Sequence, residues 1–158
     1  MQTLSLALIA AVAASAATRK SIVSTDDAPA ALGPYSQAVV IDDPENGAGM
    51  IYVSGEIGIV PGTGKLVEGG IKPETQQLMT TIGAILKAAG ASFDDVTDCT
   101  CLMADLDEYD DFNSVYETFF SDLPPARAAF QVVALPKGAR AEVKCNAVKK
   151  GNAEMFLQ

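Results

Sequence analysis

An arginine in the C-terminal third of the chain has the setting that carboxylate binding requires. Arg127 follows Pro124-Pro125-Ala126 and begins an apolar stretch that is typical of a strand. A guanidinium partly shielded at the start of a strand can bind a carboxylate through two parallel hydrogen bonds. The alternative is an ordinary ion pair with one of the 20 acidic residues. Arg127 is therefore the candidate for holding an acidic ligand.

Glu142 is the candidate that could act on water. Strand alternation over residues 140–145 places it on the same face as Arg140 and Lys144. If that face is open to solvent, these charges form ordinary cross-strand pairs. If a second subunit covers the face, Glu142 becomes a partly buried carboxylate able to hold a water molecule.

The composition excludes several kinds of catalytic site. The 158 residues include no histidine, which rules out Ser-His-Asp triads, Cys-His pairs and histidine-liganded metal sites. A net charge of −9 argues against a nucleic-acid partner, because binding to a phosphate backbone needs clustered Lys and Arg. The acidic total still permits a local pocket for a small anion, built on one of the three arginines.

The cysteines predict core packing. Their number is odd, and Cys99 and Cys101 stand close together on one predicted strand, with Cys145 further along the chain. This pattern is a poor disulfide framework, and three thiols are one ligand short of structural zinc. We expect three buried, inert thiols.

The elements that must position Arg127 and Glu142 follow from the hydrophobic periodicity. Apolar, β-branched runs predict strands over residues 38–41, 50–54, 96–103, 127–134 and 140–148. Apolar residues at three- and four-residue steps predict helices over residues 73–89 and 107–120, the second starting at Asp107 as N-cap. The order β-β-α-β-α-β-β predicts an α+β domain in which the helices cover one face of a single sheet.

Residues 1–24 are set apart as a leader, either a targeting segment or a disordered extension. The apolar run over residues 4–13 is too short to span a bilayer, and the small residues Ala14-Ser15-Ala16 resemble a cleavage site. An organelle (mitochondrion or plastid), the secretory route and the cytosol all stay open, and no membrane association is expected. The folded domain is expected over residues 25–150, followed by a loose tail over residues 151–158.

Three parts of the chain together resemble the RidA/YjgF family. Residues 28–38, with the sequence Ala-Pro-Ala-Ala-Leu-Gly-Pro-Tyr-Ser-Gln-Ala, are similar to the family's N-terminal signature. Residues 51–55, 74–90 and 113–120 are similar to its middle part, and residues 125–142 to its C-terminal signature. The resemblance implies a chorismate-mutase-like α+β subunit with a single mixed sheet and two helices on one face. It also implies a homotrimer with clefts between subunits.

The resemblance implies an activity as well. Members of the RidA type deaminate reactive 2-imino and enamine acids by hydrolysis, among them 2-aminoacrylate, 2-iminobutanoate and 2-iminopropanoate, giving 2-oxo acids and ammonia. These acids escape from pyridoxal-phosphate dehydratases, which implies a functional link to such enzymes. The reaction needs no cofactor and no metal. By position, the catalytic residues are Arg127, which binds the carboxylate, and Glu142, which orients water; the substrate-binding positions are Tyr35, Ser54, Gly55, Asn113 and Arg127.

The sequence leaves other functions open, and it departs from the family pattern at three positions. A non-catalytic ligand-binding or chaperone-like protein is the main alternative, and the acidic charge weighs against a ribonuclease or translation inhibitor. Ala129 stands where many relatives have cysteine or threonine, and Ala141 where the residue is usually larger. Glu56 stands where glutamine is common, and its charge is expected to repel a carboxylate substrate.

Overall fold

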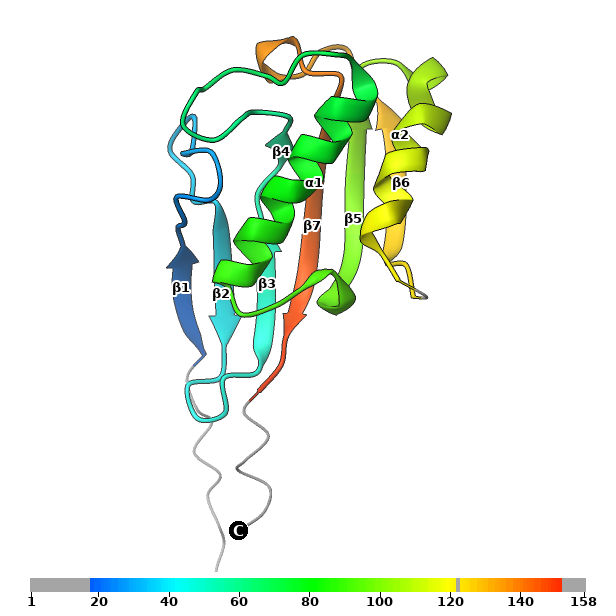
Figure 1. Cartoon of the computed structure of the whole chain (residues 1–158). Helices are drawn as coiled ribbons and strands as arrows, with labels where there is room; N and C mark the ends of the chain where they lie inside the picture. Colours follow the sequence, from blue (N-terminus) through cyan, green and yellow to red (C-terminus); the bar gives the residue numbers. More distant parts are fainter. Residues whose placement is uncertain (1–17, 122, 152–158) are drawn as a thin grey trace, which may run out of the picture.

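A seven-stranded mixed sheet forms the frame of the molecule, and the computed structural model describes residues 18–121 and 123–151 of it (Figure 1). The strands are β1 (Arg19–Val23), β2 (Ala38–Asp42), β3 (Gly49–Val53), β4 (Glu56–Ile57), β5 (Val96–Met103), β6 (Ala126–Gln131) and β7 (Ala141–Lys149). Their order is β1-β2-β3-β7-β5-β6, with the short β4 paired to β7. Only the β5–β6 pair is parallel among the described strands.

Two helices cover one face of this sheet, as predicted (Figure 1). Helix α1 (Ile71–Ala88) begins two residues earlier than the predicted start at residue 73 and ends before Gly90, whose φ of 84° suits the end of a helix. Its side chains at three- and four-residue steps, Leu78, Ile82 and Ile85, are fully buried against the sheet. Within the described residues, neither helix is long and apolar enough to cross a lipid bilayer.

The second predicted helix is shorter than expected. Helix α2 spans Tyr109–Tyr116, and one-turn 3₁₀ segments flank it: η2 (Leu106–Glu108) and η3 (Glu117–Phe119). The predicted N-cap, Asp107, is wrong, because its backbone N–H donates to the side chain of Asp105 at 2.9 Å. Two further 3₁₀ turns, η1 (Phe93–Asp95) and η4 (Pro136–Gly138), precede β5 and β7.

The cysteine prediction is wrong for one pair. Cys99 of β5 and Cys145 of β7 are direct partners in the antiparallel register, their Cα atoms are 4.1 Å apart, and they form a disulfide. Cys101 is a buried free thiol, as predicted. Pairing across 46 residues depends on which strands become neighbours, and the number of cysteines does not contain that information.

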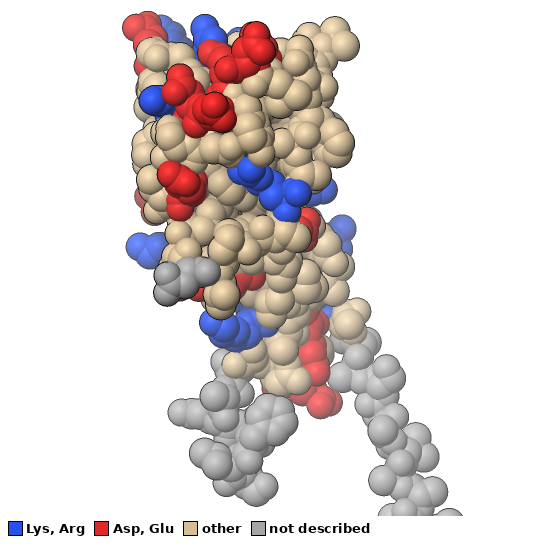
Figure 2. Space-filling model, turned by 90° about the vertical axis from the view of Figure 1, so that its right-hand side faces the viewer, with Lys and Arg blue, Asp and Glu red and all other residues tan. Residues whose placement is uncertain are grey.

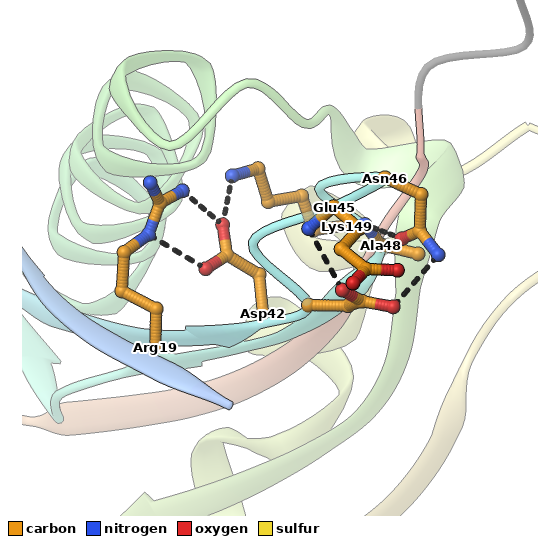
Figure 3. Close-up of polar contacts among 7 residues, drawn as sticks. Arg19, Asp42, Glu45, Asn46, Ala48 and Lys149 are labelled. Atoms are coloured by element: carbon orange, nitrogen blue, oxygen red, sulfur yellow. Dashed lines mark hydrogen bonds and ion pairs between the residues drawn. The ribbon is translucent and has the colours of Figure 1, made fainter. Parts of the chain in front are cut away.

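Strand β1 lies inside the segment set aside as leader. It pairs with β2 from Arg19 opposite Asp42 to Val23 opposite Ala38. The Nε and Nη2 of Arg19 donate to the two carboxylate oxygens of Asp42 at 3.1 and 3.0 Å, and Lys149 Nζ donates to the same carboxylate at 2.6 Å (Figure 3). Hydrogen bonds from Arg19 and then Lys149 lower the pKa of Asp42 to about 2. The sheet therefore begins at Arg19, ahead of the domain boundary expected at residue 25. The other features of the leader, the apolar run and the cleavage-like site, lie outside the described residues.

No helix of the described residues covers the other face of the sheet (Figure 1). Five large apolar side chains on it are between 39% and 68% exposed: Ile22, Ile41, Tyr52, Phe130 and Val148. We call this surface the open face. An exposed apolar area of this kind is typical of a surface that meets another protein chain.

Candidate active site

Arg127 lies near the start of β6 and is held by three side chains of α2. Its Nη1 donates to Asn113 Oδ1 at 2.8 Å and its Nη2 to Tyr109 Oη at 2.6 Å. The guanidinium carbon lies 4.7 Å from the centre of the Tyr116 ring, a cation–π distance. The side chain is nevertheless exposed, so its other N–H donors are available to an anion.

A cavity of about 420 Å³ opens beside this guanidinium. Residues from the end of α2 to the start of β6 line it: Asn113, Tyr116, Glu117, Phe120, Ser121, Pro124, Pro125 and Arg127. Basic side chains reach the surface halfway along this edge of the molecule, and acidic side chains gather toward the end that Figure 1 draws at the top (Figure 2). The cavity therefore combines room for a small molecule with one fixed cation.

Glu142 lies in a second cavity, of about 290 Å³, on the open face. Its lining includes three of the other predicted site residues, and the full set is Leu32, Tyr35, Ser54, Gly55, Ile57, Pro136 and Glu142. A Cβ on Gly55 would lie 2.9 Å from the carboxyl carbon of Glu142. Glycine at this position therefore leaves the space that the Glu142 carboxylate occupies beside the backbone. Partial burial raises the pKa of Glu142 above its ordinary value.

Two polar groups of this second cavity are already used within the subunit. Ser54 Oγ donates to the carbonyl of Ser36 at 2.7 Å. Tyr35 Oη accepts from the backbone N–H of Leu32 at 3.0 Å. These bonds fix the lining of the cavity around Glu142, while the Tyr35 ring remains about half exposed.

Glu56 differs from the expectation of a repelling charge. It is buried in β4 and lines a small cavity of about 20 Å³ that shares Tyr35 and Gly55 with the Glu142 cavity. Burial, and then the charge of Glu142, raise the pKa of Glu56 to about 8. No ion pair to Glu56 forms among the described residues. Its carboxyl is therefore neutral near pH 7, and the expected repulsion is absent there.

The predicted site residues thus form two groups in one subunit. Arg127 and Asn113 lie in the first cavity, whereas Tyr35, Ser54, Gly55 and Glu142 lie in the second. Arg127 pairs with Cys99 of β5, on the face that the helices cover, and Glu142 pairs with Leu102, on the open face. A single subunit does not bring the two groups together.

The sequence reasoning missed two residues of the Arg127 group. Tyr109 and Tyr116 belong to an apolar stripe that predicts core packing, and Tyr116 is indeed buried. Both also contact Arg127. The signal was present in the spacing, because Tyr109, Asn113 and Tyr116 recur at four- and three-residue steps and so share one face of the helix.

The comparisons with known proteins agree on one family. The family model described as Endoribonuclease L-PSP matches residues 25–149. A protein of Bos taurus named 2-iminobutanoate/2-iminopropanoate deaminase is 49% identical over 130 residues, which are 82% of this chain and 90% of the bovine chain. Reactive Intermediate Deaminase A, chloroplastic, of Arabidopsis thaliana is 40% identical over 127 residues, which are 80% of this chain and 65% of the plant chain.

A solved structure shows the same fold. RidA from an Antarctic Psychrobacter species superposes with a TM-score of 0.75 at 39% identity, covering 82% of this chain and 99% of that chain. The predicted architecture, a mixed sheet with two helices on one face, is therefore confirmed. On the family model, the sequence identities and the fold together, this chain belongs to the RidA/YjgF family.

Proposed function

We propose that this protein hydrolyses reactive 2-imino and enamine acids, such as 2-iminobutanoate and 2-iminopropanoate, to 2-oxo acids and ammonia. The observation that carries the proposal is the Arg127 guanidinium, which Tyr109 and Asn113 hold in place beside a cavity of about 420 Å³. The bovine relative named 2-iminobutanoate/2-iminopropanoate deaminase, at 49% identity, and the plant relative named Reactive Intermediate Deaminase A, at 40%, support it.

The two charged residues have separate roles in this reaction. Arg127 binds the substrate carboxylate with two parallel hydrogen bonds, which fixes the position of the imine carbon. Glu142 orients a water molecule toward that carbon and accepts a proton as the C–O bond forms, a contribution of about 10²–10⁴-fold in rate. The protonated Glu142 then returns this proton to the nitrogen of the carbinolamine. The carbinolamine hydroxyl gives its own proton to the Glu142 carboxylate as the C=O bond forms, and the C–N bond breaks with its electron pair going to nitrogen. When the imine enters in its protonated form, the products are ammonia and the 2-oxo acid, and the proton left on Glu142 passes to solvent. The raised pKa of Glu142 suits a group that both accepts and returns a proton.

The site takes residues from two neighbouring subunits in this proposal, because its two groups lie on opposite faces of the sheet. The homotrimer that the family resemblance implies would supply such pairs of subunits. Docking the β6–α2 edge of one subunit on the open face of the next would set the Arg127 cavity against the Glu142 cavity. It would also cover exposed apolar side chains such as Phe130 and Tyr52. Each cleft between subunits would then hold one complete site.

The test is a coupled assay in which a threonine dehydratase generates 2-iminobutanoate and the formation of 2-oxobutanoate is followed. We compare the protein from Thr18 onward with Arg127→Lys, which keeps the charge and loses the planar fork. Arg140→Lys is the matched control, because this arginine is exposed and pairs with Glu108 outside both cavities. We expect the parent and the control to accelerate the reaction and Arg127→Lys to lose most of the acceleration.

Absence of acceleration by a folded, trimeric parent would refute the proposal. Binding of 2-oxobutanoate by such an inactive trimer would instead favour the non-catalytic ligand-binding function. Salt-dependent binding of RNA at micromolar protein would favour the ribonuclease function, against which the net charge of −9 weighs.

We also propose that the leader is cleaved upstream of Arg19, as part of delivery to an organelle that houses pyridoxal-phosphate dehydratases. The relative from Arabidopsis named as chloroplastic supports an organelle. Retention of Arg19 follows from its two hydrogen bonds to Asp42. The mass of the protein isolated from its native cells tests this, and an intact Met1 would contradict it.

A further inference from the structure

We propose that Tyr109 is a positioning residue for substrate binding: its hydroxyl fixes the Arg127 guanidinium in the orientation that receives the substrate carboxylate. This inference rests on the proposed function for its kinetic readout. It concerns a residue that none of the family signatures in the chain includes.

Two contacts join Tyr109 to Arg127. The hydroxyl accepts from Nη2 at 2.6 Å, and the ring centre lies 5.5 Å from the guanidinium carbon. Asn113, one turn later on α2, accepts from the other terminal nitrogen at 2.8 Å. Two acceptors on two different nitrogens define the rotation of the guanidinium in its own plane, and the Tyr116 ring at 4.7 Å defines the tilt of that plane.

This restraint matters because Arg127 is otherwise exposed. A free arginine side chain samples many rotamers, and a ligand must remove part of this freedom on binding. The contacts from Tyr109 and Asn113 order the side chain before the ligand arrives. They leave N–H donors of the guanidinium unused, which is what a bidentate carboxylate requires.

Tyr109 itself is anchored independently of Arg127. Its ring packs on the core cluster between the sheet and the helices. The turn before it is capped by the side chain of Asp105, which accepts from the N–H of Asp107. Phenylalanine at position 109 would keep the ring and its packing and would remove only the hydroxyl.

The expected defect is one of binding. In Tyr109→Phe, Arg127 still forms both hydrogen bonds to the substrate carboxylate, so the imine carbon is still held where it reacts. What is lost is the ordering of the guanidinium before binding, a cost that is the same in the ground state and in the transition state. Loss of such uniform binding raises KM and leaves kcat nearly unchanged. A role confined to folding would instead lower the melting temperature without this separation of KM from kcat.

The experiment compares Tyr109→Phe with the parent and with Ser114→Ala. The control removes a hydroxyl group from an exposed residue of the same helix, outside the two cavities of the site. For Tyr109→Phe we expect KM for 2-iminobutanoate to rise about tenfold, because hydrogen bonds to charged groups are among the stronger ones. We expect kcat and the melting temperature to stay close to those of the parent. The Kd of 2-oxobutanoate, measured by calorimetry, is expected to rise by the same factor as KM.

Two results would overturn the inference. The first is a KM and a Kd of Tyr109→Phe within about twofold of the parent values. The second is a large fall in the melting temperature of this variant, because loss of folding would then explain the rise in KM and Kd. The calorimetry separates this inference from the proposed function. A parent that binds 2-oxobutanoate but does not hydrolyse imines refutes the function, and the Kd of Tyr109→Phe still decides the role of Tyr109. A parent that binds no 2-oxobutanoate refutes the role of Tyr109 as well.

Discussion

Glu56 and Glu142 are offset by one residue across the β4–β7 pair: Glu56 lies opposite Val143, and Ile57 lies opposite Glu142. The two carboxyl groups therefore belong to adjacent rungs of the sheet and project toward opposite faces of it. The charge of Glu142 still reaches Glu56 and adds to the effect of burial on its pKa. Burial, together with this second carboxylate, keeps a proton on Glu56.

The first prediction concerns this proton. The pKa of Glu56 is about 8 in the folded protein and near its ordinary value of 4.5 in the unfolded chain. Between these pH values the folded state keeps a proton that the unfolded state has lost, so the free energy of unfolding falls as pH rises. Glu56→Gln is neutral at every pH and escapes this loss. We expect its melting temperature to exceed that of the parent by a margin that grows from about pH 4.5 to about pH 8 and is constant above.

The measurement is thermal unfolding at steps of pH, with Glu68→Gln as the control because Glu68 is exposed. The control removes a carboxyl group of the same type without removing a buried one. A margin between Glu56→Gln and the parent that did not change with pH would show that Glu56 titrates normally.

The second prediction tests where the site is assembled. Arg127→Ala and Glu142→Ala should each be inactive alone, because each lacks one of the two charged groups. If every cleft takes Arg127 from one subunit and Glu142 from its neighbour, random mixing in equal amounts restores about a quarter of the clefts. Co-expression of the two variants, followed by the coupled 2-oxobutanoate assay, measures this recovery.

Each variant expressed alone is the control for the co-expression experiment. No recovery in mixed trimers would mean that both groups act within one subunit or that neither belongs to the site. Equal expression of the two chains is checked by intact mass, since the two substitutions change the mass by different amounts.

The third prediction concerns Asp42, which joins the first and last strands. Its pKa is lowered to about 2 from an ordinary 3.8, so its stabilising effect is present above about pH 4 and is lost as pH falls toward 2. Asp42→Asn should lower the melting temperature at pH 7 and approach the parent near pH 2. Asp26→Asn, at an exposed position outside the ion pairs, should match the parent throughout. An unchanged melting temperature for Asp42→Asn at pH 7 would contradict the expectation.

The fourth prediction counts thiols. Cys99 and Cys145 are disulfide-bonded, and burial raises the pKa of the Cys101 thiol to about 11. Protein isolated without reductant and unfolded in denaturant should take up one alkyl group, and three after reduction. Uptake of three groups before reduction would show that the pair exists as thiols.

Much of the fold could be predicted from local pattern. The strand over residues 96–103 was predicted with both ends correct, because its alternation places Cys99, Cys101 and Met103 on the core side. Strand β4 was missed because it is two residues long. Strand β1 was missed because its sequence has only two apolar residues, Ile22 and Val23, after three polar ones. Both strands depend on partners distant in the sequence. Arg19, for example, becomes part of a strand through its bonds to Asp42.

The residues of the candidate site were predicted by type and position, whereas their arrangement was not. Alternation correctly places Glu142 on the same face as Lys144. It does not reveal that Arg127 faces the opposite way, because that depends on the register of β6 against β5. The contact from Tyr109 was hidden for a similar reason: a tyrosine in an apolar stripe predicts packing, and only the neighbouring strand gives its hydroxyl a partner.

Asp42 accepts hydrogen bonds from both Arg19 and Lys149, and this arrangement determines where the chain can be cut and rejoined. Because one carboxylate holds both, the beginning and the end of the folded chain are neighbours. Both ends of the folded chain lie at one end of the sheet, and β4 and η4 lie at the other (Figure 1). The Glu142 cavity is at the end that holds β4 and η4. A short peptide could therefore join the ends in a circular permutant, and a fused domain or surface tether at either end would leave that cavity open to its substrate.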